Sequence, residues 1–194
     1  MKWTQAKRWV MAFACIGVVL FLLSQAPRLQ ARSSYTSSGI SGIAMATERS
    51  PGIKPGSPVP QTDLVDLAGN PVPLLGKQKT VLLFIRTTCS ASKQQLTHLQ
   101  GWVSRNPGYA KKFDLRVVSP EKLDLLRPFG QEYSFPVYQD PSAMLEDQLG
   151  VNGSPFLFLV DNDGRVILRW AGAVETDDGN LMDTLLEMLL DGAY

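Results

Sequence analysis

Cys89 is the residue whose type and position point most directly to chemistry. It stands immediately before residues 90–105, a segment in which apolar residues recur at helical spacing: Leu96, Leu99, Trp102 and Val103. At the start of that predicted helix, unpaired backbone N–H groups and the positive end of the helix dipole stabilise a thiolate over a thiol. Cysteines at helix N-termini have pKa values of about 3.5–7.5, against about 8.5 for a free thiol, and the thiolate is the attacking species. The sequence therefore predicts a reactive thiolate at Cys89, with Arg86 and Lys93 as candidate cationic neighbours.

A long apolar strand is needed to bring this cysteine into place. Residues 81–85 form an unbroken apolar run, which is typical of a strand buried on both faces of a sheet, and this strand leads into helix 90–105. The remaining pattern predicts these elements in order: a hairpin of strands 64–67 and 72–74 around Gly69-Asn70, strand 115–118, helix 121–132, strand 135–138, a helix that starts at Pro141 and is closed by Gly150, a hairpin of strands 156–160 and 166–170 around residues 161–164, and a helix near residues 180–190. Alternating strands and helices, followed by a hairpin and a helix, predict an α/β domain with a mixed central β-sheet flanked by helices on both faces.

Five stretches of the chain match the pattern of one known family in order and in spacing. They are Pro58-Val59-Pro60, Asp66-Leu67-Ala68-Gly69, residues 81–89, Gly150-Val151-Asn152-Gly153-Ser154-Pro155, and residues 158–164. Through these stretches the chain resembles the TlpA-like and redoxin (AhpC/TSA-like) branch of the thioredoxin superfamily, from residue 55 to residue 190. The resemblance implies a thioredoxin-like fold and thiol–disulfide oxidoreductase activity.

The resemblance also assigns the residues of the site. The family usually has a second cysteine three positions after the first, whereas this chain has Ser92 there and therefore a CxxS motif that begins at Cys89. Ser92 is unable to resolve a mixed disulfide, but its hydroxyl can donate a hydrogen bond to the Cys89 thiolate, so release requires an outside thiol. Pro155 matches the proline that the family keeps in a cis peptide bond opposite the cysteine, where the backbone at Ser154 pairs with a bound substrate strand. Cys89 and Ser92 are thus the expected catalytic residues, and Ser154 and Pro155 the expected substrate-binding residues.

The composition argues against several classes of protein. Nineteen basic and 18 acidic residues give a net charge of +1, so no long-range field attracts nucleic acid to the chain. Two cysteines and one histidine are too few for the usual four-ligand zinc site. We expect no metal, no cofactor and no nucleic-acid partner, and we expect His98 to be a solvated residue on a helix.

The N-terminal residues predict contact with a membrane. Residues 9–23 are uncharged and follow a short basic segment, and residues 24–26 extend the run toward the length that spans a bilayer. The excess of basic residues before the run predicts a cytoplasmic N-terminus, and Cys15 within it is expected to pack as a small apolar residue. Cleavage after Ala26, as in a secreted protein, is the alternative, although it would leave Pro27 at the new N-terminus.

The resulting domain organisation has four parts. Residues 1–8 form a cytoplasmic N-terminus, residues 9–26 a transmembrane anchor or signal segment, residues 27–54 a flexible linker rich in Ser, Gly and Pro, and residues 55–194 the thioredoxin-like domain. This organisation predicts a single-pass membrane protein whose C-terminal domain lies outside the cytoplasm, in the periplasm or another extracytoplasmic space.

Three functions fit these observations to different degrees. The leading prediction is an exported, membrane-tethered thiol–disulfide oxidoreductase that acts by monothiol exchange through Cys89, with exported protein thiols or disulfides, or a small thiol, as its partners. The alternative is a thioredoxin-like binding or assembly factor for an exported protein that catalyses nothing. A peroxiredoxin-type peroxidase is the third; peroxiredoxins place a threonine three residues before the reactive cysteine and a proline further upstream, whereas this chain has Arg86 and Leu82 there.

Overall fold

The computed structural model of the chain describes residues 52–173 and 181–192. The predicted cytoplasmic N-terminus, the predicted membrane segment with Cys15, and nearly all of the predicted linker lie outside these residues. Within the two described ranges, no helix combines the length and the apolar character needed to cross a membrane.

The centre of the fold is a mixed β-sheet, to which the described residues contribute seven strands. The strands are β1 (Asp63–Val65), β2 (Pro71–Pro73), β3 (Thr80–Phe84), β4 (Asp114–Ser119), β5 (Val137–Gln139), β6 (Phe156–Val160) and β7 (Val166–Ala171). Their order across the sheet is β2-β1-β5-β4-β3-β6-β7. β3 runs parallel to β4, and β4 parallel to β5, whereas the remaining neighbours are antiparallel.

β3 is an interior strand of the sheet, and all five of its residues are buried. It pairs with β4 along one edge and with β6 along the other, so its backbone hydrogen bonds are satisfied within the sheet. Its side chains alternate between two cores: Val81 and Leu83 belong to one, and Leu82 and Phe84 to the other. Burying one such side chain contributes roughly 1.5–3 kcal/mol. An unbroken apolar run is therefore most stable in a strand with both faces buried, as the sequence predicted.

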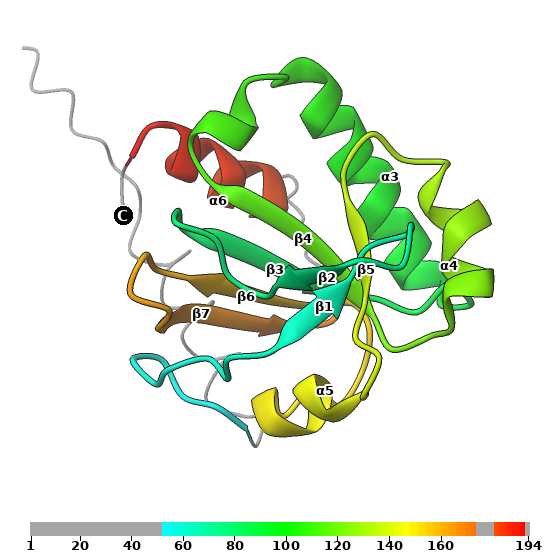
Figure 1. The fold of residues 1–194 in the computed structure, drawn as a ribbon. Helices are drawn as coiled ribbons and strands as arrows, with labels where there is room; N and C mark the ends of the chain where they lie inside the picture. The colour runs from blue at the N-terminus through cyan, green and yellow to red at the C-terminus, as the bar shows by residue number, and fades with distance from the viewer. Residues whose placement is uncertain (1–51, 174–180, 193–194) are drawn as a thin grey trace, which may run out of the picture. The chain divides into compact units, whose positions relative to one another are not determined.

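Helices cover both faces of the sheet, as the sequence predicted (Figure 1). The helices are α3 (Ser90–Arg105), the short 3-10 helix η1 (Tyr109–Lys111), α4 (Leu123–Gly130), α5 (Met144–Leu149) and α6 (Leu181–Leu190). One core contains buried side chains of α3, α4 and α6: Leu96, Leu99, Trp102, Val103, Phe129, Met182, Leu185, Leu186 and Leu189. The core on the opposite face contains Leu145 and Leu149 of α5. The predicted α/β class and the predicted apolar face of α3 are therefore confirmed.

The hairpin of β6 and β7 forms around Asp161. Its carboxylate Oδ1 accepts hydrogen bonds from the backbone N–H groups of Asp163 (2.9 Å) and Arg165 (2.7 Å). Gly164 has φ +75°, a conformation that costs glycine little and other residues more. On its other edge β6 pairs with β3, so that its first residue, Phe156, lies opposite the last residue of β3, Phe84.

The predicted start of α5 at Pro141 was wrong by three residues. The helix begins at Met144, because Asp140 and Ser142 build a separate turn in front of it. Asp140 Oδ1 accepts hydrogen bonds from the N–H and hydroxyl of Ser142, and Oδ2 accepts one from the N–H of Leu145 at 3.0 Å. The predicted end is confirmed, since Gly150 follows the helix with φ +70°.

Other elements also differ from the sequence prediction. β1 ends at Val65 and not at Leu67, because the Asp66 carboxylate accepts a hydrogen bond from the N–H of Asn70 at 2.8 Å and closes the turn early. α4 begins at Leu123 and not at Glu121, whose side chain is bound elsewhere. The 3-10 helix η1 was not predicted, and its Tyr109 packs edge-on against Trp102, with ring centroids 6.1 Å apart.

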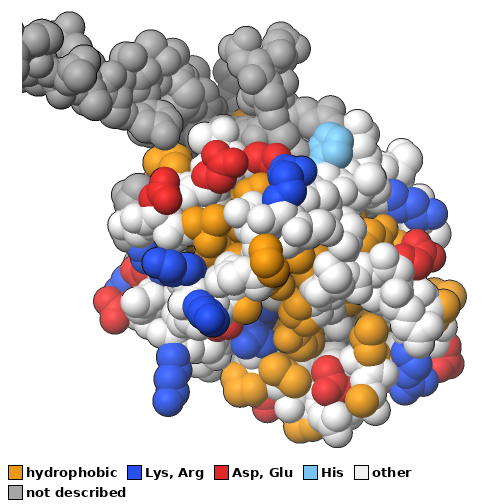
Figure 2. Space-filling model, turned by 90° about the horizontal axis from the view of Figure 1, so that it is seen from above, with side chains coloured by type: hydrophobic (Ala, Val, Ile, Leu, Met, Phe, Trp, Pro, Cys, Tyr) orange, Lys and Arg blue, Asp and Glu red, His pale blue; other side chains and the backbone are white. Residues whose placement is uncertain are grey.

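The first described residues pack on the domain. The N–H of Ile53, within the predicted linker, donates to the carbonyl of Leu149 (3.3 Å), and Arg169 Nη1 donates to the carbonyl of Ile53 (2.8 Å). On the face drawn in Figure 2, basic and acidic side chains are interspersed and do not gather into one patch of a single sign.

Candidate functional site

Cys89 is the residue that caps the N-terminus of α3. It has an extended conformation (φ −81°, ψ 119°) and stands five residues beyond the end of β3, and its carbonyl accepts the helical hydrogen bond from the N–H of Lys93 at 3.1 Å. Its own N–H donates to the carbonyl of Arg86 at 3.1 Å, which closes a tight turn before the helix. Cys89 is a free, partly exposed thiol. The strand thus delivers the cysteine to the helix N-terminus, as the sequence predicted.

The thiol of Cys89 faces the loop that precedes β6. Its Sγ donates a hydrogen bond to the carbonyl oxygen of Ser154 at 3.2 Å. The peptide bond between Ser154 and Pro155 is cis, as the resemblance implied. Two segments 65 residues apart in the sequence therefore meet at the sulfur atom.

Several hydrogen-bond donors surround the sulfur and favour its ionised form. Burial raises the pKa of the Cys89 thiol, but hydrogen bonds from the N–H of Ser92, the hydroxyl of Ser154, the hydroxyl of Ser92 and the N–H of Ala91 together outweigh it. The pKa of Cys89 therefore lies below its ordinary value. The hydrogen bond to the Ser154 carbonyl requires the protonated thiol. When Cys89 ionises, this hydrogen bond is lost, and the sulfur accepts hydrogen bonds from the surrounding donors.

Ser92 lies in the first turn of α3, where its side chain is completely buried. Its hydroxyl oxygen accepts a hydrogen bond from the N–H of Arg86 at 3.4 Å. The structure thus brings all four predicted site residues together, with Cys89 and Ser92 at the start of the helix and Ser154 and Pro155 opposite.

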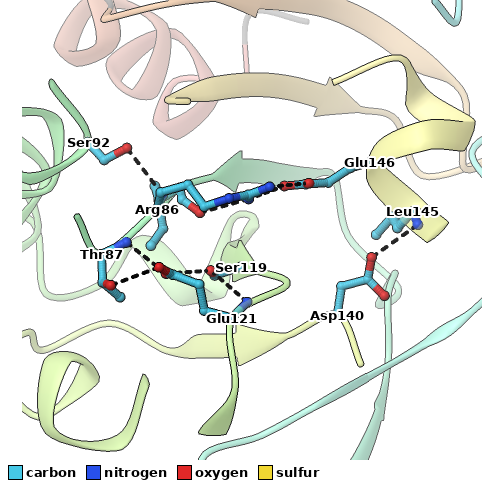
Figure 3. A network of polar contacts seen from close by, with 9 residues as sticks. Arg86, Thr87, Ser92, Ser119, Glu121, Asp140, Leu145 and Glu146 are labelled. Carbon is cyan, nitrogen blue, oxygen red and sulfur yellow. Dashed lines mark hydrogen bonds and ion pairs between the residues drawn. The ribbon is translucent and has the colours of Figure 1, made fainter. Parts of the chain in front are cut away.

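Two glutamates that the sequence analysis did not single out hold the loop before Cys89 (Figure 3). The carboxylate of Glu146, on α5, accepts hydrogen bonds from both terminal nitrogens of Arg86, at 2.5 and 2.6 Å. Glu121, which follows β4, accepts hydrogen bonds from the N–H and the hydroxyl of Thr87, at 2.7 and 2.9 Å, and from the hydroxyl of Ser119 at 3.0 Å. The guanidinium of Arg86 is therefore engaged by a carboxylate, and the cation predicted to assist Cys89 has another partner.

One sequence signal for Glu146 was available but weak. Glu146 stands between Leu145 and Leu149 of α5 and is buried. A charged residue on the buried side of a short helix indicates an ion-pair partner, because an unpaired buried carboxylate is costly. The identity of that partner depends on the fold.

The described residues hold no group of three or more His, Cys, Asp or Glu side chains that is able to bind a metal ion. An open pocket of about 320 Å³ lies between α3 and α6, and its lining comprises Thr97, His98, Gly101, Arg105 and Asp183. His98 is exposed there, on the part of α3 beyond its first two turns. The pocket does not include Cys89, whose sulfur lies instead beside the carbonyl of Ser154.

Comparison with known proteins identifies the fold. No protein-family model and no curated protein sequence matches the chain. Among solved structures, the thioredoxin domain of a thiol-disulfide oxidoreductase from Bacteroides vulgatus is 20% identical, with a TM-score of 0.55 over 71% of this chain and 99% of that chain. Peroxidoxin BcpB from Mycobacterium tuberculosis is 19% identical, with a TM-score of 0.58 over 72% and 97% of the two chains. StoA from Bacillus subtilis is 20% identical, with a TM-score of 0.54 over 69% and 98%. The chain therefore has a thioredoxin-like fold, as the resemblance implied.

Proposed function

We propose that the chain is an exported, membrane-tethered thiol–disulfide oxidoreductase that acts on protein cysteines by monothiol exchange through Cys89. The observation that carries this proposal is the partly exposed Cys89 thiol at the N-terminus of α3, with its sulfur 3.2 Å from the backbone of the Ser154–Pro155 loop. One solved structure with this fold, the thioredoxin domain of a thiol-disulfide oxidoreductase, supports the proposal, whereas a peroxidoxin shares the fold as well. Tethering and export rest on the uncharged N-terminal run and the basic residues before it.

The exchange consists of two displacement steps at sulfur. In the first, the Cys89 thiolate attacks one sulfur of a substrate disulfide; the substrate S–S bond breaks, a bond to Cys89 forms, and the other substrate sulfur leaves as a thiolate. In the second, an outside thiolate attacks the mixed disulfide, which returns Cys89 as a thiolate and leaves the substrate sulfur in a new disulfide. Ser92 takes no covalent part, and its hydroxyl helps to stabilise the Cys89 thiolate in both steps.

The Ser154–Pro155 loop supports binding of an extended polypeptide beside Cys89. It precedes β6 at the end of the sheet where β3 leads into α3, and Asn152 and Gly153 before it are exposed. A substrate strand that pairs with the backbone at Ser154 would bring its disulfide to the Cys89 sulfur. This geometry favours a protein disulfide over a small thiol compound as the substrate.

Formation of a mixed disulfide tests the proposal. In the full chain carrying Cys15→Ser, Cys89 is the only cysteine, so adducts are assigned without ambiguity. We expect intact-mass measurement to show one adduct after incubation with a peptide disulfide at neutral pH. The adduct should persist until reduced glutathione is added, and it should be absent in the matched variant that also carries Cys89→Ser.

The outcomes separate the proposal from its alternative. An adduct that is absent at neutral pH, while the chain still binds the reduced peptide, would mean that the domain is a binding or assembly factor and not an oxidoreductase. Rapid consumption of hydrogen peroxide dependent on Cys89, without peptide exchange, would instead identify a peroxidase.

A further inference from the structure

We propose that the Arg86–Glu146 ion pair is a positioning element: it fixes the loop that carries Cys89 against the Ser154–Pro155 loop and so sets the rate at which peptide disulfides, in contrast to small disulfides, react with Cys89. This inference rests on the proposed exchange at Cys89. It assigns a role to two residues that take no covalent part in that exchange.

The backbone of Arg86 is bound to both ends of the CxxS motif. Its carbonyl accepts a hydrogen bond from the N–H of Cys89 (3.1 Å), and its N–H donates to the hydroxyl oxygen of Ser92 (3.4 Å). A displacement of Arg86 is therefore transmitted directly to the first turn of α3. Its side chain extends away from that helix toward α5, where it meets Glu146 (Figure 3).

The backbone of Glu146 is hydrogen-bonded to the segment that leads into the Ser154–Pro155 loop. Its backbone carbonyl accepts a hydrogen bond from the N–H of Val151 at 2.8 Å, directly beyond Gly150. Three residues after Val151 the chain reaches Ser154, whose carbonyl oxygen contacts the Cys89 sulfur at 3.2 Å. The contacts therefore form a closed circuit from Cys89 through Arg86, Glu146 and the Ser154 loop back to Cys89.

Within this circuit the ion pair joins two segments that are 60 residues apart in the sequence. It is bidentate, which fixes the orientation of both planar groups as well as their separation. The Glu146 side chain is only 9% exposed and the Arg86 side chain 37% exposed, so water competes poorly for the carboxylate. Thr87 and Glu121 anchor the same loop to β4, but that anchor does not reach α5.

A peptide disulfide has to contact the loop that carries Cys89 and the Ser154–Pro155 loop at the same time, whereas a small disulfide has to reach only the Cys89 sulfur. Loss of the ion pair should therefore slow the peptide reaction more than the small-molecule reaction. A misplacement of about 1 Å at a reacting group costs up to about 100-fold in rate, so a loss between about 10-fold and 100-fold in the ratio of the two rates is expected.

Two disulfides with the same leaving group test this inference. Dithiobis(nitrobenzoate) is the small probe, and an extended peptide whose cysteine carries nitrothiobenzoate is the peptide probe; both release the same coloured thiolate. Each is reacted with the full chain carrying Cys15→Ser, alone and together with Glu146→Gln. Glu146→Gln removes the charge at nearly constant volume and leaves Arg86 partly exposed to water, so the variant is expected to fold.

The expected result is a ratio of peptide rate to small-probe rate at least about tenfold lower in Glu146→Gln than in its parent. The charge-swapped variant Arg86→Glu with Glu146→Arg should recover at least about a third of the parental ratio, because the opposite charges again face each other. Asp183→Asn is the matched control: it removes an ion pair with Arg105 that joins α3 to α6, and it should leave the ratio unchanged.

A purely structural role for the pair would lower the unfolding temperature and leave the ratio of the two rates unchanged, and that result would overturn the inference. A parent chain that reacts with the small probe but not with the peptide would overturn the proposed exchange on protein disulfides and this inference with it. A parent that reacts with both, combined with an unchanged ratio in Glu146→Gln, would overturn the positioning role alone.

Discussion

Ser92→Cys is expected to shorten the lifetime of the mixed disulfide at Cys89 by at least about 100-fold, measured at about 0.01 mM added thiol. The wild-type chain has to wait for an outside thiol, whereas a thiol held in the same helical turn acts at an effective concentration of about 1 mM or more. Residues three apart on a helix are neighbours, and the Ser92 hydroxyl already donates a hydrogen bond to the Cys89 sulfur, so a thiol at position 92 lies close to it. Intact-mass analysis of the decaying adduct gives the lifetime directly.

Ser92→Ala is the matched control for this variant. It removes the same hydroxyl, and with it the hydrogen bond accepted from the N–H of Arg86, but it adds no thiol. The adduct of Ser92→Ala should persist at least as long as that of the wild-type chain at the same thiol concentration, because Cys89 leaves more slowly without the hydroxyl. Equal decay in Ser92→Cys and Ser92→Ala would show that position 92 is unable to reach the mixed disulfide, and it would contradict the described geometry of the first turn of α3.

Arg86→Met is expected to lower the free energy of unfolding by about 2–3 kcal/mol. Removing one partner of a fully buried ion pair costs about 3–5 kcal/mol, because the remaining charge loses its compensation. Glu146 approaches that limit, since its side chain is 9% exposed, but the 37% exposure of the Arg86 side chain means that water reaches part of the site and lowers the cost. Urea denaturation of the full chain and of the variant at neutral pH measures the difference.

A double variant separates the lost charge from the lost packing. Arg86→Met combined with Glu146→Leu leaves no unpaired carboxylate, so it should be destabilised by only about 1 kcal/mol or less. A single Arg86→Met variant within about 0.5 kcal/mol of the wild type would mean that solvent already compensates Glu146, and it would contradict the burial found for this carboxylate.

The elements nearest to the site could be predicted from the sequence because their signals are local. The apolar run of β3 and the helical spacing of Leu96, Leu99 and Trp102 specify a buried strand followed by α3, and the structure has both. The turn residues Asp161 and Gly164 likewise specify the hairpin of β6 and β7. In each case the burial pattern or the turn chemistry repeats over a few consecutive residues.

The elements that were misplaced depend on side chains that compete with the helix for backbone donors. Pro141 is a favourable first residue of a helix, yet the Asp140 carboxylate bonds to Ser142 and Leu145 and delays α5 to Met144. Similarly, Glu121 suits the first turn of a helix, but its carboxylate accepts hydrogen bonds from Thr87. Local propensity does not reveal a partner 34 residues away.

The candidate site could be predicted only in part, because only its local motifs are visible in the sequence. Cys89 and Ser92 belong to one short motif, and Pro155 was assigned by resemblance to a family, so these residues could be named in advance. The ion pair of Arg86 with Glu146 joins two segments whose proximity exists only in the fold. A single sequence contains no local pattern that specifies such a pair.

The pH dependence of Cys89 alkylation by iodoacetamide measures whether Cys89 is a reactive thiolate in the folded chain. Because the pKa in the folded chain is lowered, ionisation of Cys89 stabilises the folded state above the unfolded pKa of about 8.5, and this contribution is lost as the pH falls through the folded pKa. In the full chain carrying Cys15→Ser we expect a half-maximal alkylation rate clearly below pH 8.5 when folded, about 8.5 in urea, and an intermediate value in Ser92→Ala. A folded midpoint at or above that of the chain in urea would mean that the fold does not stabilise the Cys89 thiolate, and it would favour a binding domain without thiol chemistry.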